Sequence, residues 1–94
     1  MAEQQWVFKR TRTFRKKFDT LSSDQQSKAR ERFREWRKEP FSQALGVHKI
    51  NRLSALLRRT IRAIHVEKNL VVTFAVAGKE ITSLDIGTEK EVYG

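Results

Sequence analysis

The stretch that decides the fold is residues 61–86, IRAIHVEKNLVVTFAVAGKEITSLDI. It contains three runs rich in β-branched and aromatic residues, which are typical of strands. The runs are 61–66, 70–76 and 80–86. The short segments between them hold the turn-forming residues asparagine and glycine, so that successive strands pair as neighbours. The stretch therefore predicts an antiparallel meander of three strands.

Helical periodicity replaces strand alternation before this meander. Phe14 and Phe18 recur on one face of a predicted helix, after a threonine that caps it. A second helix is predicted to begin at the capping-box pair Ser23 and Gln26 and to end near Lys38, because a proline follows shortly after. Two consecutive helices, each with an apolar stripe, predict an α-hairpin.

A short strand is predicted at the start of the chain. Aromatic and polar residues alternate over residues 5–9, the pattern of a half-buried strand. Residues 41–50 are ambiguous, and residues 52–59 fit either a loop or a strand. The whole chain, residues 1–94, is then expected to be a single α+β domain in the order β-α-α-β-β-β, an antiparallel sheet with an α-hairpin packed on one face.

Positive charge is the dominant feature of the composition. The chain carries 20 Lys and Arg against 11 Asp and Glu, a formal net charge of +9. The excess is most one-sided in residues 41–68, which hold six basic residues and one acidic residue. Such a surface concentrates phosphate chains and attracts acidic proteins, and we expect RNA as the polyanion. The alternative is a solvated basic face without a specific ligand.

Several classes of protein and site are excluded or disfavoured by the sequence. The chain has no cysteine, which removes disulfides and thiolate chemistry. We find no signal-peptide pattern and no apolar run that spans a bilayer, so we expect a cytoplasmic location and no membrane partner. The two histidines lack the spacing of a metalloprotease motif, and we expect neither a metal nor a cofactor.

A cluster of basic residues and histidines is the candidate for chemistry. RNA cleavage needs a base for the ribose 2′-OH, cations for the charged transition state and an acid for the departing 5′-oxygen. Histidine suits the proton transfers, and the planar fork of arginine binds two phosphate oxygens. Tyr93, near the end of the chain, is a further candidate for base stacking or proton transfer. The cluster comprises His48, Lys49, Arg52, Arg58, Arg59, Arg62 and His65.

Each candidate also has a purely structural interpretation. His48 is able to edge a strand, and His65 lies in mid-strand, where a structural histidine is at least as common as a catalytic one. Arg58 and Arg59 are most simply phosphate contacts or solvated side chains. Regular alternation places Arg62 on the strand face opposite His65, so the two act together only across a bulge or an edge.

Residues 61–93, IRAIHVEKNLVVTFAVAGKEITSLDIGTEKEVY, resemble the last strands and tail of the RelE/ParE superfamily of bacterial toxins. The shared tail is the Ile-Gly-Thr step at 86–88, followed by an acidic residue and a tyrosine. The upstream His-Lys-Ile step at 48–50 matches a histidine-basic-aliphatic step of the family. The β-α-α-β-β-β order agrees too, and the diagnostic residues lie in 47–94.

The resemblance implies the toxin of a type II toxin–antitoxin pair, with an acidic antitoxin as partner. Ribosome-dependent members cut mRNA without a metal, whereas ParE-like members block DNA gyrase. By this resemblance, His48 and Lys49 fall at the first basic site of the family. Arg62 falls on the arginine of its central strand, and Tyr93 falls on its terminal aromatic residue.

Two positions depart from the family pattern. Glu89 stands where many members carry a histidine, and Val71 stands where many carry an arginine. His65 is a candidate substitute for one missing function, and Glu89 is a candidate base. The leading hypothesis is a ribosome-associated, metal-independent mRNA endonuclease, an mRNA interferase that inhibits translation. The alternatives are a non-enzymatic ParE-like inhibitor of gyrase and a basic binding module with the toxin fold but no activity.

Overall fold

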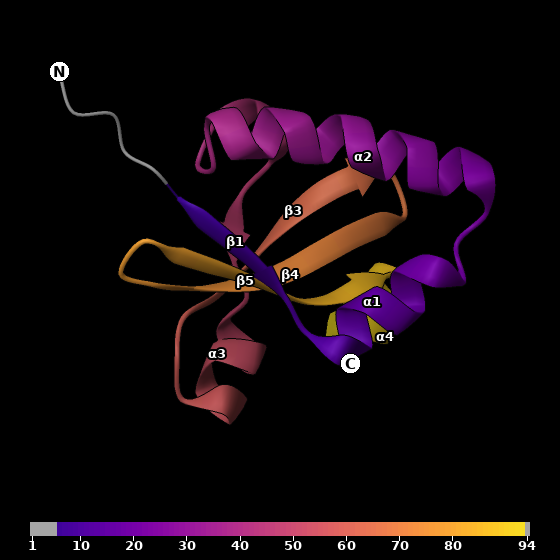
Figure 1. The fold of residues 1–94 in the computed structure, drawn as a ribbon. Coiled ribbons are helices and arrows are strands. Elements are labelled where there is room, and N and C mark those ends of the chain that lie inside the picture. The colour runs from indigo at the N-terminus through magenta and orange to yellow at the C-terminus, as the bar shows by residue number, and fades with distance from the viewer. Residues whose placement is uncertain (1–5, 94) are drawn as a thin grey trace, which may run out of the picture.

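The computed structural model describes residues 6–93, and the side chains of residues 6–92. It confirms the α+β class and the order of an α-hairpin followed by a meander. Figure 1 shows α2 along one face of the sheet and α3 on the other side. The elements are β1 (Val7–Arg10), α1 (Arg12–Asp19), α2 (Ser23–Lys38), the 3-10 turn η1 (Gln43–Leu45), β2 (His48–Lys49), α3 (Asn51–Leu57), β3 (Ile61–Glu67), β4 (Leu70–Ala77), β5 (Glu80–Gly87) and α4 (Glu89–Tyr93).

The strands form one sheet in the order β1-β5-β4-β3-β2. β3, β4 and β5 make the predicted antiparallel meander, and β2 adds an antiparallel pair beside β3. The other edge differs from the expectation, because β1 pairs with β5 in parallel and the sheet is mixed. The reason is the long connection between these two strands, which runs through the α-hairpin and the rest of the sheet and imposes no antiparallel turn.

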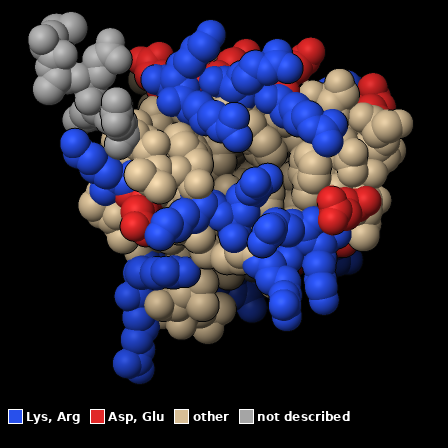
Figure 2. All heavy atoms as spheres, in the orientation of Figure 1, with Lys and Arg blue, Asp and Glu red and all other residues tan. Residues whose placement is uncertain are grey.

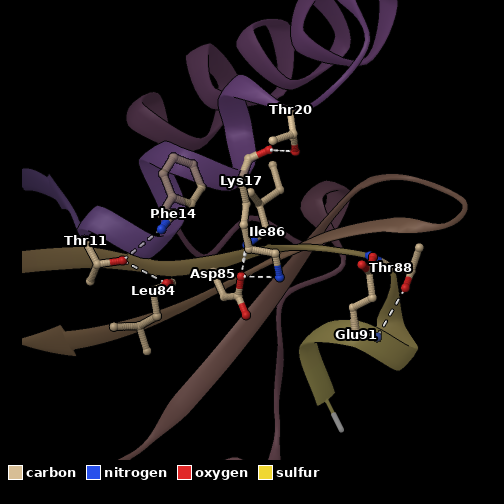
Figure 3. Close-up of polar contacts among 9 residues, drawn as sticks. All are labelled: Thr11, Phe14, Lys17, Thr20, Leu84, Asp85, Ile86, Thr88 and Glu91. Carbon is tan, nitrogen blue, oxygen red and sulfur yellow. Dashed lines mark hydrogen bonds and ion pairs between the residues drawn. The ribbon is translucent and has the colours of Figure 1, made fainter.

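Side chains that cap the helices set where α1 and α2 begin. Thr11 caps α1 and also ties it to the sheet, because its hydroxyl accepts the Phe14 N–H and donates to the Leu84 carbonyl at 2.8 Å (Figure 3). The capping box of α2 is Ser22 with Gln25, one residue before the predicted pair. Ser22 has the extended backbone that a capping residue needs, whereas the next serine is already helical.

The segment 52–59, expected as a loop or a strand, is largely helical. Its helix, α3, is closed by Ser54, whose hydroxyl oxygen accepts the Ile61 N–H at 2.9 Å. The Ile50 N–H donates to the Ile61 carbonyl at 2.8 Å, which joins the two ends of the connection. The bond between the Ser54 side chain and the Ile61 backbone favours a compact turn of helix over an extended strand.

Within the described residues, no helix is long and apolar enough to cross a membrane.

The face of the sheet under α1 and α2 holds an aromatic core. Phe14, Trp36 and Phe74 are at most 2% exposed. Trp36 packs edge-to-face on Phe74, with ring centroids 4.8 Å apart. Burying each large apolar side chain contributes on the order of 1.5–3 kcal/mol. The aliphatic members of the same cluster are Leu45, Ile64, Leu70, Val72, Ile81 and Ile86.

The opposite face of the sheet carries smaller buried side chains. Strand alternation turns Ala63, Val71 and Thr73 away from the aromatic core, and each is at most 2% exposed. The C-terminal helix α4 packs on β4 and β5 and buries Val92. Both faces of the central strand β4 are therefore buried, but only one of them packs against aromatic rings.

Candidate functional site

His48 and His65 stack on each other, although α3 and a turn separate them in the chain. β2 pairs with β3 so that His48 lies opposite Ala63, which places His65 diagonally across on the same face. The ring centroids are 5.4 Å apart and the ring planes differ by 24°. His48 is exposed and His65 is half-buried. Two imidazoles in this arrangement are able to serve as an acid and a base for one phosphodiester.

The turn before β2 fixes the orientation of His48. Its Nδ1 lies 2.9 Å from the Gly46 carbonyl oxygen, which is an acceptor only. Nδ1 is therefore the donor in this contact, which sets the orientation of the ring. Gly46 has a left-handed φ of 65°, and a Cβ there would lie 3.2 Å from His65 Cδ2. The left-handed backbone favours glycine, and a larger residue here would displace the His65 ring by a few tenths of an ångström.

Arg32 of α2 connects the two segments that carry the histidines. Its Nε donates to the His65 carbonyl at 2.9 Å, and its Nη2 donates to the Ala44 carbonyl at 2.8 Å. One guanidinium thus holds both β3 and the turn before β2. Sequence reasoning missed this residue because it belongs to a basic helix face. The sequence shows only that Arg32 is spaced to pair with Glu35 one helical turn away. That spacing does not indicate either of its backbone carbonyl partners.

Arg62 is not part of the histidine pair. Its guanidinium lies over the ring of Phe41, 5.5 Å from the centroid, in a cation–π contact. Phe41 packs edge-to-face on Trp6, with centroids 5.6 Å apart. Arg62 shares its strand face with Ile64, and the irregularity in β3 follows His65 instead of lying between the two candidates. The strand alternation that predicted their separation is therefore regular at this point.

Four predicted phosphate contacts are exposed, on β2 or around α3, and Lys49 pairs with Arg62 on the strand face opposite His48. We call them the α3 rim. Arg58 is the C-cap of α3 and has a left-handed φ of 55°. Glycine is the usual residue in that conformation, so the arginine is held at a conformational cost. The α3 rim consists of Lys49, Arg52, Arg58 and Arg59.

The C-terminal helix lies on the same sheet face as the histidine pair. His65 lies opposite Val71 on β4, and Val71 lies opposite Gly87 on β5. One row thus crosses three strands, and the usual strand spacing puts Gly87 about 10 Å from His65. Val71 forms an apolar floor between them. Glu89, the first residue of α4, is exposed, and the side chain of Tyr93 lies outside the described residues.

Thr88 and Glu91 fix the start of α4 (Figure 3). The Thr88 N–H donates to Glu91 Oε1 at 3.0 Å, and the Glu91 N–H donates to Thr88 Oγ1 at 3.2 Å. The bond from the Thr88 backbone is the main reason that the pKa of Glu91 is lowered, and the Lys17 ammonium adds to it. Lys17 also pairs with Asp85 at 2.8 Å. Asp85 and Glu91 are thus both engaged in local structure.

Within the described residues, no three His, Cys, Asp or Glu side chains form a group that could hold a metal ion. The absence of a metal from the mechanism stays a prediction from the sequence.

Comparison with known proteins identifies the fold. No protein-family model and no curated protein matches the chain. RelE in the RelE–RelB complex of Pyrococcus horikoshii OT3 matches with a TM-score of 0.69 and 14% identity, over 89% of this chain and 94% of that chain. The DinJ–YafQ toxin–antitoxin complex of E. coli contains a match with a TM-score of 0.72 and 14% identity, over 96% and 99%.

A third match is HP0894 of Helicobacter pylori, solved in solution, with a TM-score of 0.67 and 18% identity. It covers 93% of this chain and 98% of that chain. The likenesses extend over nearly the whole of each protein while the identities are low. Together with the strand order and the position of the α-hairpin, they show that this chain has the fold of the RelE and YafQ toxins.

Proposed function

We propose that this chain is the toxin of a type II toxin–antitoxin system and cleaves mRNA at the ribosome. The observation that carries the proposal is the His48–His65 stack, 5.4 Å between centroids, on the fold of RelE and YafQ. The net charge of +9 supports a nucleic-acid substrate, because each phosphate neutralised by Lys or Arg releases counterions.

The proposed reaction is a transesterification within the RNA. One imidazole takes the proton of a ribose 2′-OH, whose oxygen bonds to the adjacent phosphorus as the bond to the 5′-oxygen breaks. The other imidazole gives its proton to that 5′-oxygen, which leaves a 2′,3′-cyclic phosphate and a 5′-hydroxyl. We assign His48, the more exposed of the two imidazoles, as the base. His65 is then the acid.

The α3 rim supplies the positive charge that this reaction needs. Guanidinium groups bind the non-bridging phosphate oxygens as forks and stabilise charge that develops in the transition state. Glu89 and Tyr93 belong to α4 on the same sheet face, and we keep them as candidates for contacts to the base or the leaving group. Arg62 is engaged by Phe41, and we assign it a supporting role in positioning β3.

An acidic antitoxin is the proposed partner. The matching RelE and YafQ structures include complexes with RelB and DinJ. A partner rich in Asp and Glu complements a chain with nine excess positive charges. The expected genetic observation is a neighbouring short reading frame that encodes an acidic chain, and co-expression of that chain is expected to restore growth.

The test uses purified protein and translating ribosomes, with mRNA ends mapped by primer extension. We expect discrete cuts with the wild-type chain and a loss of at least about 100-fold in His65→Gln. Lys16→Gln is the matched control, because it removes an exposed charge on α1, away from the histidines. Intact message at stoichiometric wild-type protein would contradict the proposal.

The second candidate is a non-enzymatic inhibitor of DNA gyrase. It is favoured by Glu89 at the position where the family resemblance implies a histidine, and by the apolar Val71 in the row beside His65. A gyrase poison leaves cleaved or relaxed plasmid in a supercoiling assay and leaves mRNA whole. Unimpaired growth on inducible expression would instead indicate a binding module without toxicity.

A further inference from the structure

A second basic surface lies at the other edge of the sheet, between α2 and the β1–α1 segment. It contains a cavity of about 310 Å³. The cavity has an aromatic floor formed by Phe14, Phe18 and Phe33. In Figure 2, Lys and Arg side chains line both sides of the hollow below α2. The arginines that line the cavity, which we call the groove arginines, are Arg10, Arg30, Arg34 and Arg37.

The groove arginines converge without a counter-charge. None of them makes an ion pair with a carboxylate in the part of the chain that the structure describes, and no Asp or Glu lines the cavity. Arg30 lies over the Phe18 ring, 5.4 Å from its centroid. By contrast, Arg32 on the same helix is neutralised by Glu35 at 2.9 Å. Four like charges around one cavity repel each other, and an anion in the cavity would relieve that repulsion.

Trp36 lies next to this groove and is a natural reporter on it. It is 2% exposed, and its Nε1–H is a buried donor without a hydrogen-bond partner. Trp36 lines a smaller cavity of about 80 Å³, which shares Arg10, Phe14, Phe33 and Arg37 with the larger one. An unsatisfied buried donor costs about 1–3 kcal/mol in an otherwise complete structure. The Trp36 ring lines this smaller cavity, so its signals report on a ligand that enters beside it.

We propose that this groove binds a nucleoside phosphate. Guanidinium forks match phosphate oxygens in pairs, and the phenylalanine rings offer an apolar wall to a base. The volume is at the lower end of the range for small-molecule sites, which suits one nucleotide. The nucleotide is either free in solution or a unit of an RNA strand, since both present the same chemistry.

The shape of the groove disfavours an acidic peptide helix as its occupant. Such a helix inserts several apolar side chains into a long groove with open rings. Here Phe14 is buried and Phe18 is already covered by Arg30. The site also lies at the β1 edge, whereas the histidine pair lies at the β2 edge of the same sheet. It is therefore separate from the proposed cleavage site.

The test follows the Trp36 Nε1–H signal by NMR in the full chain, with that signal assigned through Trp6→Phe. We expect a saturable shift on adding 5′-AMP or 5′-GMP, and a much smaller one with adenosine or inorganic phosphate alone. Arg34→Gln and Arg37→Gln are each expected to weaken binding about tenfold. Arg15→Gln is the control, because it removes an exposed arginine of α1 that does not line the cavity.

Short RNA oligomers separate the two sources of the nucleotide. A shift with the mononucleotides supports a free ligand, and a shift with the oligomers alone supports a unit of an RNA strand. An equal loss in Arg15→Gln and Arg34→Gln would overturn the site in favour of diffuse charge attraction. A shift with an acidic peptide and none with nucleotides would overturn it too. His65→Gln is expected to bind nucleotide normally, so that failure of cleavage and failure of this site are distinguishable.

Discussion

The two faces of the sheet differ in packing and in exposure. The face under α1 and α2 is filled with aromatic rings such as Trp36 and Phe74, both at most 2% exposed. The other face carries Ala63 and Val71, and it is covered in part by α4, with five residues, while α3, with seven, packs beside β3. Large rings and a 16-residue helix stabilise the first face. At the β2 edge of the second face, where the histidine pair lies, His48 is exposed.

This difference places stability and chemistry on different sides of one sheet. A residue in a dense aromatic cluster is costly to truncate, since its neighbours collapse only partially into the cavity. An exposed imidazole such as that of His48 contributes little to that cluster. We therefore place the reaction at the exposed β2 edge of the second face.

The largest expected effect is on the aromatic face. Phe74→Ala is expected to lower the free energy of unfolding by about 3–5 kcal/mol, because it leaves a cavity beside Trp36. Val71→Ala is the matched change on the other face, where the side chain is equally buried but smaller, with an expected cost of about 2 kcal/mol. Urea denaturation of both variants measures the two values. Equal costs would remove the distinction between the faces.

Gly46→Ala tests the histidine edge. The new Cβ would lie 3.2 Å from His65 Cδ2, so the imidazole has to move, and we expect RNA cleavage to fall roughly 10- to 100-fold. Gly78→Ala is the control, since Gly78 has a similar φ of 60° but nothing within 4 Å of an added Cβ. Both variants share the backbone strain of a left-handed alanine. Equal cleavage by the two proteins would show that the His65 position is not limiting.

Arg58→Gly separates stability from binding on the open face. Relief of the left-handed arginine is expected to raise the free energy of unfolding by about 1 kcal/mol. The same change removes a charge of the α3 rim and is expected to weaken RNA binding. Arg59→Gly removes a neighbouring exposed charge without relieving a positive φ, so it is expected to weaken binding with no gain in stability. Thermal melts and an RNA-binding titration give both quantities.

The smallest expected effect is the acid response of α4. The pKa of Glu91 is lowered in the folded chain, chiefly by the Thr88 N–H. Its contribution to stability is therefore present above the ordinary glutamate pKa and is lost as the pH falls through the lowered value. Glu91→Gln is expected to make the decline in stability below the ordinary pKa slightly less steep. Denaturation at a series of pH values from 7 to 3 (about one unit apart) checks this; parallel curves for the two proteins would rule out the contribution.

Local patterns predicted most of the elements. The three strands of the meander begin at the predicted residues Ile61, Leu70 and Glu80. These boundaries were predictable because side-chain alternation and turn residues are patterns of only a few neighbouring positions. The capping box was predicted one residue late, since two adjacent serines offer the same side chain. The helix α3 was missed because the bond that closes it, from the Ile61 N–H to the Ser54 hydroxyl oxygen, joins two residues that do not signal each other in the sequence.

The candidate site was predicted in its residue types and only partly in its arrangement. His48, His65 and the α3 rim were named from charge and chemistry, and the separation of Arg62 from His65 follows from strand alternation. The hydrogen bonds from Arg32 to the His65 and Ala44 carbonyls were not predictable in the same way. Its partners are backbone carbonyls, which every residue carries, so no side-chain pattern marks them.

The sequence alone determined the α+β class, the basic character and the identity of the proton-transfer candidates, because these depend on composition and short-range periodicity. Tertiary structure decided what lies together. The register of β2 on β3 stacks the two histidines, and the packing of β1 and α1 beside α2 adds Arg10 and the phenylalanine rings to the arginines of one helix face. Register and helix packing are set by contacts between distant segments, and such contacts leave no local signal in the sequence.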